Sequence, residues 1–104
     1  MARPLDKAAH DEWLTLQGEL TNGFALRYPL DVHVWIAGAE WAADAPRLNL
    51  HSYGDNRDEA IANLKAEIVD QLRLLREQDE QLSPAMADQR DLLTGLLVVP
   101  DGLP

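Results

Sequence analysis

A stripe of apolar residues at helical spacing constrains the fold more than any other feature of this 104-residue chain. From Asn56 onward, apolar side chains recur every three or four residues, and polar side chains fill the rest of the circumference. The stripe consists of Ala60, Ile61, Leu64, Ile68, Leu72 and Leu75. This period is that of an amphipathic helix with one buried side, and the stripe is too short for a coiled coil. The sequence therefore predicts a helix from Asn56 to about Asp79 that packs on a sheet.

The residues before this helix show the shorter period of strands. Apolar and other side chains alternate from Leu30 to Ile36, and again from Leu48 to Tyr53. A period of two is what a strand with one buried side requires. We expect the first segment to be a well-buried strand and the second, which has fewer apolar members, to lie at a sheet edge. We interpret residues 37–46 as a connection.

The N-terminal part allows two interpretations. Asn22-Gly23 lies between two apolar stretches, and this pair is a strong hairpin signal because both residues tolerate positive φ. A helix from Asp6 to Leu20 is the alternative, favoured by Lys7-Ala8-Ala9 and by the spacing of the apolar residues that follow. The pattern leaves strand and helix open for residues 6–20.

A second helix is expected near the C-terminus. Ser83 is a suitable N-cap, and Pro84 suits the first helical turn, so the sequence predicts a helix from Ser83 to about Leu97. The length suffices for one core, whereas two cores would each be marginal. We therefore expect residues 1–104 to form a single α+β domain. Its small, mainly antiparallel sheet of three or four strands would pack against the long helix, with the second helix added.

Charge and composition limit the classes of function. Eighteen carboxylates against nine Lys and Arg give a formal charge of -9, which disfavours direct binding of nucleic acid. The chain has no cysteine, so thiolate metal sites and a cysteine nucleophile are excluded. No apolar run is long enough to span a membrane, and we expect a cytoplasmic protein. Opposite charge speeds encounter, so a basic protein is a suitable partner.

The joint between strand and helix contains the densest group of residues that could take part in catalysis or in ligand binding. Gly54-Asp55-Asn56 leads directly into the helix, and Asp58 and Glu59 follow. A phosphate cradle would need several glycines and preferably a lysine, whereas this joint has one glycine and three carboxylates. Carboxylates in a first helical turn usually cap the helix rather than bind a metal. We interpret the joint as a corner, in which Asn56 caps the helix and Glu59 reaches back toward its start.

The sequence of this joint and of the helix that follows is similar to that of a known family. The match comprises Gly54-Asp55, then Glu59-Ala60, then the helix Ile61-Ala62-Asn63-Leu64-Lys65-Ala66-Glu67-Ile68. Together with the preceding strands, this resembles the HicB-like antitoxin domain over about Asp31 to Leu75. The resemblance implies a small antiparallel sheet packed against helices, like a degenerate RNase H core without catalytic carboxylates. Many members neutralise a small basic RNA-cleaving toxin, and many carry a C-terminal DNA-binding module. After Leu75 only one more short helix fits, so we expect no such module.

Six residues form the candidate interface. If the long helix covers one side of the two expected strands, the opposite side carries Asp31, His33, Trp35, Asn49, His51 and Tyr53. Trp and Tyr are enriched at protein interfaces, so this side suits self-association or another protein chain. Stacking of nucleic-acid bases would also require surrounding Arg and Lys, which this side lacks.

The sequence thus favours a non-catalytic protein-interaction module similar to a HicB-like antitoxin, with no cofactor and no metal. We expect it to form a homo-oligomer or to bind a basic protein, and the resemblance implies that this protein is a small basic toxin. The alternative is a small metal-dependent or hydrolytic enzyme that uses His33, His51 and nearby carboxylates. Ser52 beside His51 does not make a hydrolytic pair, because neighbouring strand residues point to opposite sides.

Overall fold

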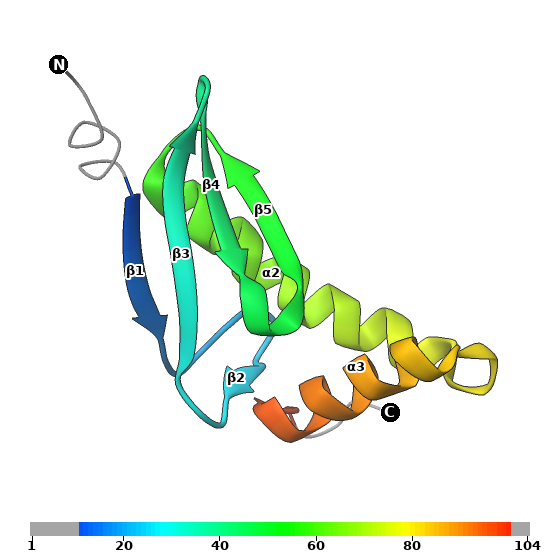
Figure 1. Ribbon diagram of the computed structural model, residues 1–104. Coiled ribbons are helices and arrows are strands. Elements are labelled where there is room, and N and C mark those ends of the chain that lie inside the picture. Colours follow the sequence, from blue (N-terminus) through cyan, green and yellow to red (C-terminus); the bar gives the residue numbers. More distant parts are fainter. Residues whose placement is uncertain (1–10, 101–104) are drawn as a thin grey trace, which may run out of the picture.

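The alternating residues of the N-terminal half form a four-stranded sheet in the computed structural model, which describes residues 11–100 (Figure 1). Its spatial order is β1 (Asp11–Leu16), β3 (Leu30–Ala37), β4 (Glu40–Ala45) and β5 (Leu50–Gly54), and every neighbouring pair is antiparallel. A second sheet pairs two short strands, β2 (Ala25–Leu26) and β6 (Leu97–Val98). The α+β class and the antiparallel sheet packed against a long helix are confirmed.

β4 corrects the interpretation of residues 37–46 as a connection. It forms a tight hairpin with β3, and Gly38 at the turn has a φ of 69°, in the left-handed region. Ala42 and Ala43 point to opposite sides of the sheet and are both buried. Because small apolar side chains occupy both sides, the sequence of β4 shows no alternation.

The second expected strand is shorter than predicted. Leu48 ends a single 3-10 turn, η1 (Pro46–Leu48), and Asn49 follows in the left-handed conformation with a φ of 56°. The strand begins only at Leu50. β5 does lie at a sheet edge, as expected.

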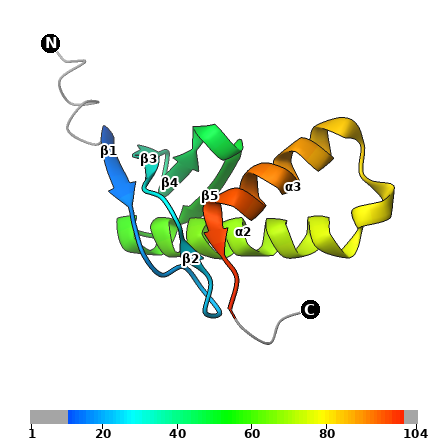
Figure 2. The same ribbon diagram turned by 90° about the horizontal axis from the view of Figure 1, so that it is seen from below.

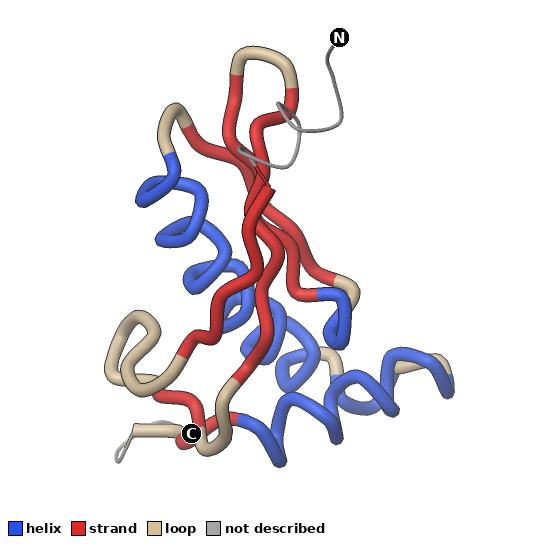
Figure 3. The backbone as a smooth tube through the Cα atoms, turned by 60° about the vertical axis from the view of Figure 1, so that its left-hand side comes forward, coloured by secondary structure: helices blue, strands red, loops and turns tan. Residues whose placement is uncertain are grey.

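The first described segment is a strand rather than a helix. β1 pairs along its whole length with β3, so the helical alternative is wrong for residues 11–16, and residues 6–10 lie outside the described part of the chain. The Asn22-Gly23 turn is confirmed, with φ values of 56° and 83°. It closes only a small loop, in which Phe24 N–H donates to Thr21 O at 3.0 Å. Figure 3 shows the short strands at the far end of the molecule from the β3–β4 hairpin.

The long helix α2 (Arg57–Glu77) crosses one side of the four-stranded sheet (Figure 2). α3 (Pro84–Leu96) lies beside the C-terminal half of α2 and leads directly into β6. Between the two helices runs a 3-10 turn, η2 (Asp79–Gln81). Both predicted caps are confirmed: Glu59 N–H donates to Asn56 Oδ1, and Met86 N–H donates to Ser83 Oγ. Gln89 of α3 joins the layers, because it accepts from Gln71 of α2 and donates to Leu48 O.

The core fills the space between α2 and the sheet. Val32 and Val34 of β3 are completely buried, as are five members of the α2 stripe: Ala60, Leu64, Ile68, Leu72 and Leu75. Phe24, Leu30, Leu48, Leu93 and Leu97 extend the core beneath the loops and α3. No polar or charged side chain among the described residues is fully buried.

Candidate functional site

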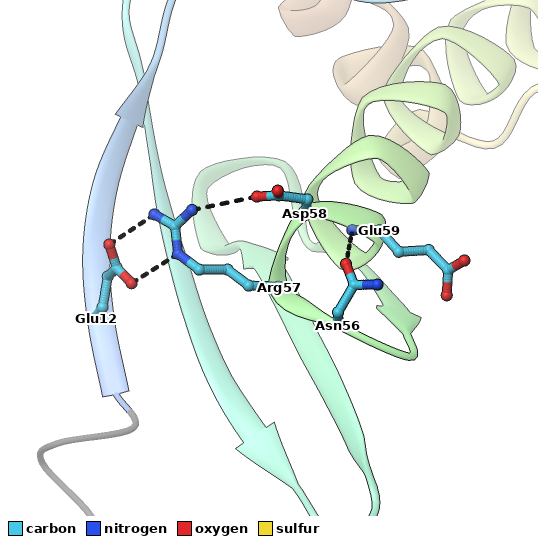
Figure 4. A network of polar contacts seen from close by, with 5 residues as sticks. All are labelled: Glu12, Asn56, Arg57, Asp58 and Glu59. Carbon is cyan, nitrogen blue, oxygen red and sulfur yellow. Dashed lines mark hydrogen bonds and ion pairs between the residues drawn. The ribbon is translucent and has the colours of Figure 1, made fainter.

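The joint between β5 and α2 is a capped corner, as predicted. Asn56 Oδ1 accepts from Glu59 N–H at 2.8 Å, and Glu59 Oε1 accepts from Asp55 N–H at 2.5 Å. Figure 4 shows Asn56 and Glu59 at the helix start, with Asp58 turned toward Arg57. The oxygen atoms of Asn56 and Glu59 are therefore used to bind the backbone of the corner itself.

Gly54 is needed at this joint for a steric reason. Its φ is not in the left-handed region, so conformational freedom is not the reason for a glycine. A Cβ atom at this position would lie 2.5 Å from Ala60 N and 2.8 Å from Glu59 C. Gly54 is therefore required because the start of α2 passes directly against the strand.

The side of the sheet away from α2 is the candidate site, and we call it the open face. The strand register places the following residues on it: Asp11, Trp13 and Thr15 of β1, Asp31, His33 and Trp35 of β3, Ala42 and Asp44 of β4, and His51 and Tyr53 of β5. Trp13 is 62% exposed and Tyr53 is 47% exposed. Neither helix packs on this side (Figures 1 and 2).

A stack of three rings lies at the β1 side of the open face. His33 stacks between Trp13 and Trp35, with ring centroids 4.7 Å apart in both pairs. The Nε2 atom of His33 also contacts the carboxylate of Asp11. At the other side of the sheet, His51 and Tyr53 make an edge contact at 5.8 Å. The aromatic residues of the open face are therefore held by one another.

Five of the six residues in the expected interface lie on the open face, but they do not form one cluster. β4 separates His33 and Trp35 from His51 and Tyr53, and its Asp44 lies directly opposite both histidines in the register. Asn49 is the exception, because it ends η1 before β5 begins. Trp13 was not among the six expected residues. Asp11, Trp13 and Thr15 alternate with Glu12, Leu14 and Leu16, and this period of two was the available signal, which the helical alternative obscured.

The strands carry a marked excess of negative charge. They contain five carboxylates and no Lys or Arg, namely Asp11, Glu12, Asp31, Glu40 and Asp44. The nearest cation at the start of α2 is Arg57, which donates to both carboxylate oxygens of Glu12 at 2.9 and 2.8 Å (Figure 4). This hydrogen bonding lowers the pKa of Glu12 below its ordinary value.

Two shallow hollows border the sheet. One, of about 250 Å³, lies at the η1 end of the open face and is lined by Trp13, Pro29, Asp31, Pro46 and Arg47. The other, of about 380 Å³, lies between η1 and the first turns of α3. Within residues 11–100, no group of three or more His, Cys, Asp or Glu side chains is arranged to hold a metal ion. Ser52 and His51 point to opposite sides of the sheet, as expected.

None of the described helices is both long enough and apolar enough to cross a membrane. No protein-family model, curated protein sequence or solved structure matches the chain.

Proposed function

We propose that this domain is a non-catalytic protein-interaction module whose open face binds a partner rich in Lys and Arg. The observation that carries the proposal is the composition of that face: exposed aromatic rings lie among carboxylates, and no Lys or Arg occurs in the strands. Exposed aromatic groups are typical anchors of protein interfaces. Indole and phenol rings also attract cations, and neighbouring carboxylates add to that attraction.

Charge favours a basic partner over a second copy of this chain. Each copy has a formal charge of -9, so two copies repel each other at long range, whereas a cationic protein is attracted. The resemblance to HicB-like antitoxin domains adds a specific form of this role, in which the partner is a small basic RNA-cleaving protein. The same charge disfavours nucleic acid as the ligand.

A peptide panel tests the proposal. It contains an extended basic peptide that alternates Arg with Val, a helix-forming basic peptide of Arg, Ala and Leu, and versions of both with Glu in place of Arg. We expect at least one basic peptide to bind, in a salt-dependent manner, and neither acidic peptide to bind. Measurement is by titration of backbone amide signals in solution NMR.

Variants identify the surface that binds. Trp35→Ala combined with Tyr53→Ala should weaken binding, because both rings belong to the open face. Tyr28→Ala is the matched control, since Tyr28 is 59% exposed but lies outside the four strands. Equal affinity in all variants, or no binding by either basic peptide, would refute the proposal. If light scattering shows that the protein is a dimer and that the double substitution makes it a monomer, the partner is a second copy instead.

A further inference from the structure

The two edges of the sheet differ in how far they are blocked. At the β5 edge, the side chain of Asn63 from α2 donates to Tyr53 O at 2.7 Å. The residue before β5, Asn49, is in the left-handed conformation, and Leu48 O accepts from Gln89 of α3. Side chains from both helices and an irregular backbone therefore hinder the addition of another strand at β5.

The β1 edge has none of these features. Its six residues form a regular strand that contains no Pro, Gly or Lys, the residues that commonly protect an edge. Within residues 11–100, the hydrogen bonds that reach the backbone of β1 are those of its ladder with β3. No group among residues 11–100 therefore pairs with the outward N–H and C=O groups of β1.

The side chains at this edge specify what such a segment would carry. β1 contains two carboxylates, Asp11 and Glu12, and no Lys or Arg. Glu12 lies on the α2 side and is bound by Arg57, whereas Asp11 lies on the open face. A strand added beside β1 would place every second side chain on the open face, about 5 Å from its neighbour on β1. At the centre of that row is Trp13, the most exposed of the large apolar residues described, with Asp11 on one side of it and Thr15 on the other.

We propose that the basic partner binds as an additional strand along β1, with Arg or Lys at alternate positions on the open face. One such cation would lie over the Trp13 indole and near the Asp11 carboxylate, where ring and charge attract it together. The inference rests on the proposed function and adds the mode of binding and the pattern of the bound segment. A second copy is disfavoured as the occupant, because it would bring the same carboxylates to the same edge.

The test uses the extended peptide that alternates Arg with Val, made long enough to match the six residues of β1. Two matched versions carry N-methyl groups on alternate backbone amides, one version for each set of amides. One set would face β1, so we expect one of the two versions to lose about tenfold in affinity while the other binds almost normally. Bound peptide should slow hydrogen exchange at the outward amides of β1.

Side-chain variants supply an independent measurement. Trp13→Ala should weaken binding of the alternating peptide several-fold, and Tyr28→Ala should leave it unchanged, since both rings are exposed and only Trp13 adjoins the edge. Placing Glu for Arg in the peptide should abolish binding.

Several outcomes overturn the inference and leave the proposed function intact. Equal binding of both N-methylated versions shows that the peptide does not add to the strand ladder, as does binding of the helix-forming basic peptide alone. A third outcome is a dimer of the peptide-free protein, detected by light scattering, in which the outward β1 amides are protected from hydrogen exchange. That result would assign the edge to a second copy. The proposed function itself fails if neither basic peptide binds, if no open-face variant alters binding, or if the double substitution of Trp35 and Tyr53 breaks up a dimer.

Discussion

The two sides of the sheet are built from alternate residues of the same strands, yet they differ completely in chemistry. Toward α2, Val32 and Val34 are wholly buried against the aliphatic stripe of the helix. On the open face, their neighbours His33 and Trp35 lie among exposed rings and carboxylates. Burial of the first side stabilises the fold, whereas the side chains of the second lie at the surface, where we propose that a partner binds. Substitutions should therefore separate stability from recognition.

The largest effect is expected on the buried side. Ile68 is completely buried in the α2 stripe, so Ile68→Ala should lower the free energy of unfolding by about 2–5 kcal/mol through lost burial and a residual cavity. Urea denaturation followed by circular dichroism measures this loss. Trp13→Ala on the open face is the control and should cost no more than about 1.5 kcal/mol, because Trp13 is 62% exposed and loses mainly its stacking on His33. Similar losses in both variants would contradict the division between the two sides.

A smaller loss of stability is expected at the joint between β5 and α2. Gly54→Ala would place a methyl group 2.5 Å from Ala60 N, and the helix backbone would have to shift. We expect this substitution to cost about 1–3 kcal/mol in the same denaturation experiment. Gly95→Ala is the matched control, because Gly95 lies inside α3 with nothing near its Cβ position. That change should raise stability by up to about 1 kcal/mol, and a loss there would show that steric space alone does not distinguish the glycines.

The cap of α2 should contribute less than its packing. Asn56→Ala removes the acceptor for Glu59 N–H and should cost about 1 kcal/mol. Asn56→Asp keeps an acceptor oxygen at the same place and should preserve most of the stability. If the aspartate variant were as unstable as the alanine variant, the loss could not be assigned to the capping bond.

The smallest effect concerns the exposed link between β1 and α2. Arg57 lowers the pKa of Glu12, so the stabilising contribution is complete above the ordinary glutamate pKa and is lost as pH falls through the lowered value. An NMR titration of the Glu12 side chain should show the low pKa, and Arg57→Gln should return it toward normal. Arg73→Gln, on another part of α2, should leave the Glu12 titration unchanged.

The elements that the sequence predicted correctly are those defined by local interactions. The expected limits of the long helix, Asn56 to about Asp79, differ from the observed ones by two residues at most, because capping side chains and the apolar stripe act over short distances. Ser83 was identified as a cap for the same reason.

The errors occur where burial depends on distant neighbours. In β4, Ala42 is covered on the open face because Trp35 and Tyr53 lie directly opposite it in the register. No pattern within residues 40–45 reveals this cover. The open face was only partly predicted. Placing Trp13 on it required knowing that its segment is a strand, and the pattern of residues 6–20 does not distinguish a strand from a helix. Asn49 was placed wrongly since alternation cannot reveal a left-handed residue at a strand start.

The pairing of β2 with β6 determines when folding of the chain can be completed. The guanidinium of Arg27 donates to Leu97 O, 70 residues further along the chain. While the protein is being synthesised, the sheet and α2 can assemble from residues already outside the ribosome, but the last contacts of Phe24 and Leu26 must wait for residue 97. This long loop closes late in folding, because the loss of chain entropy on closure is offset only by the contacts that form last. In a newly made chain this apolar corner is therefore buried last, and until then it is open to incorrect association.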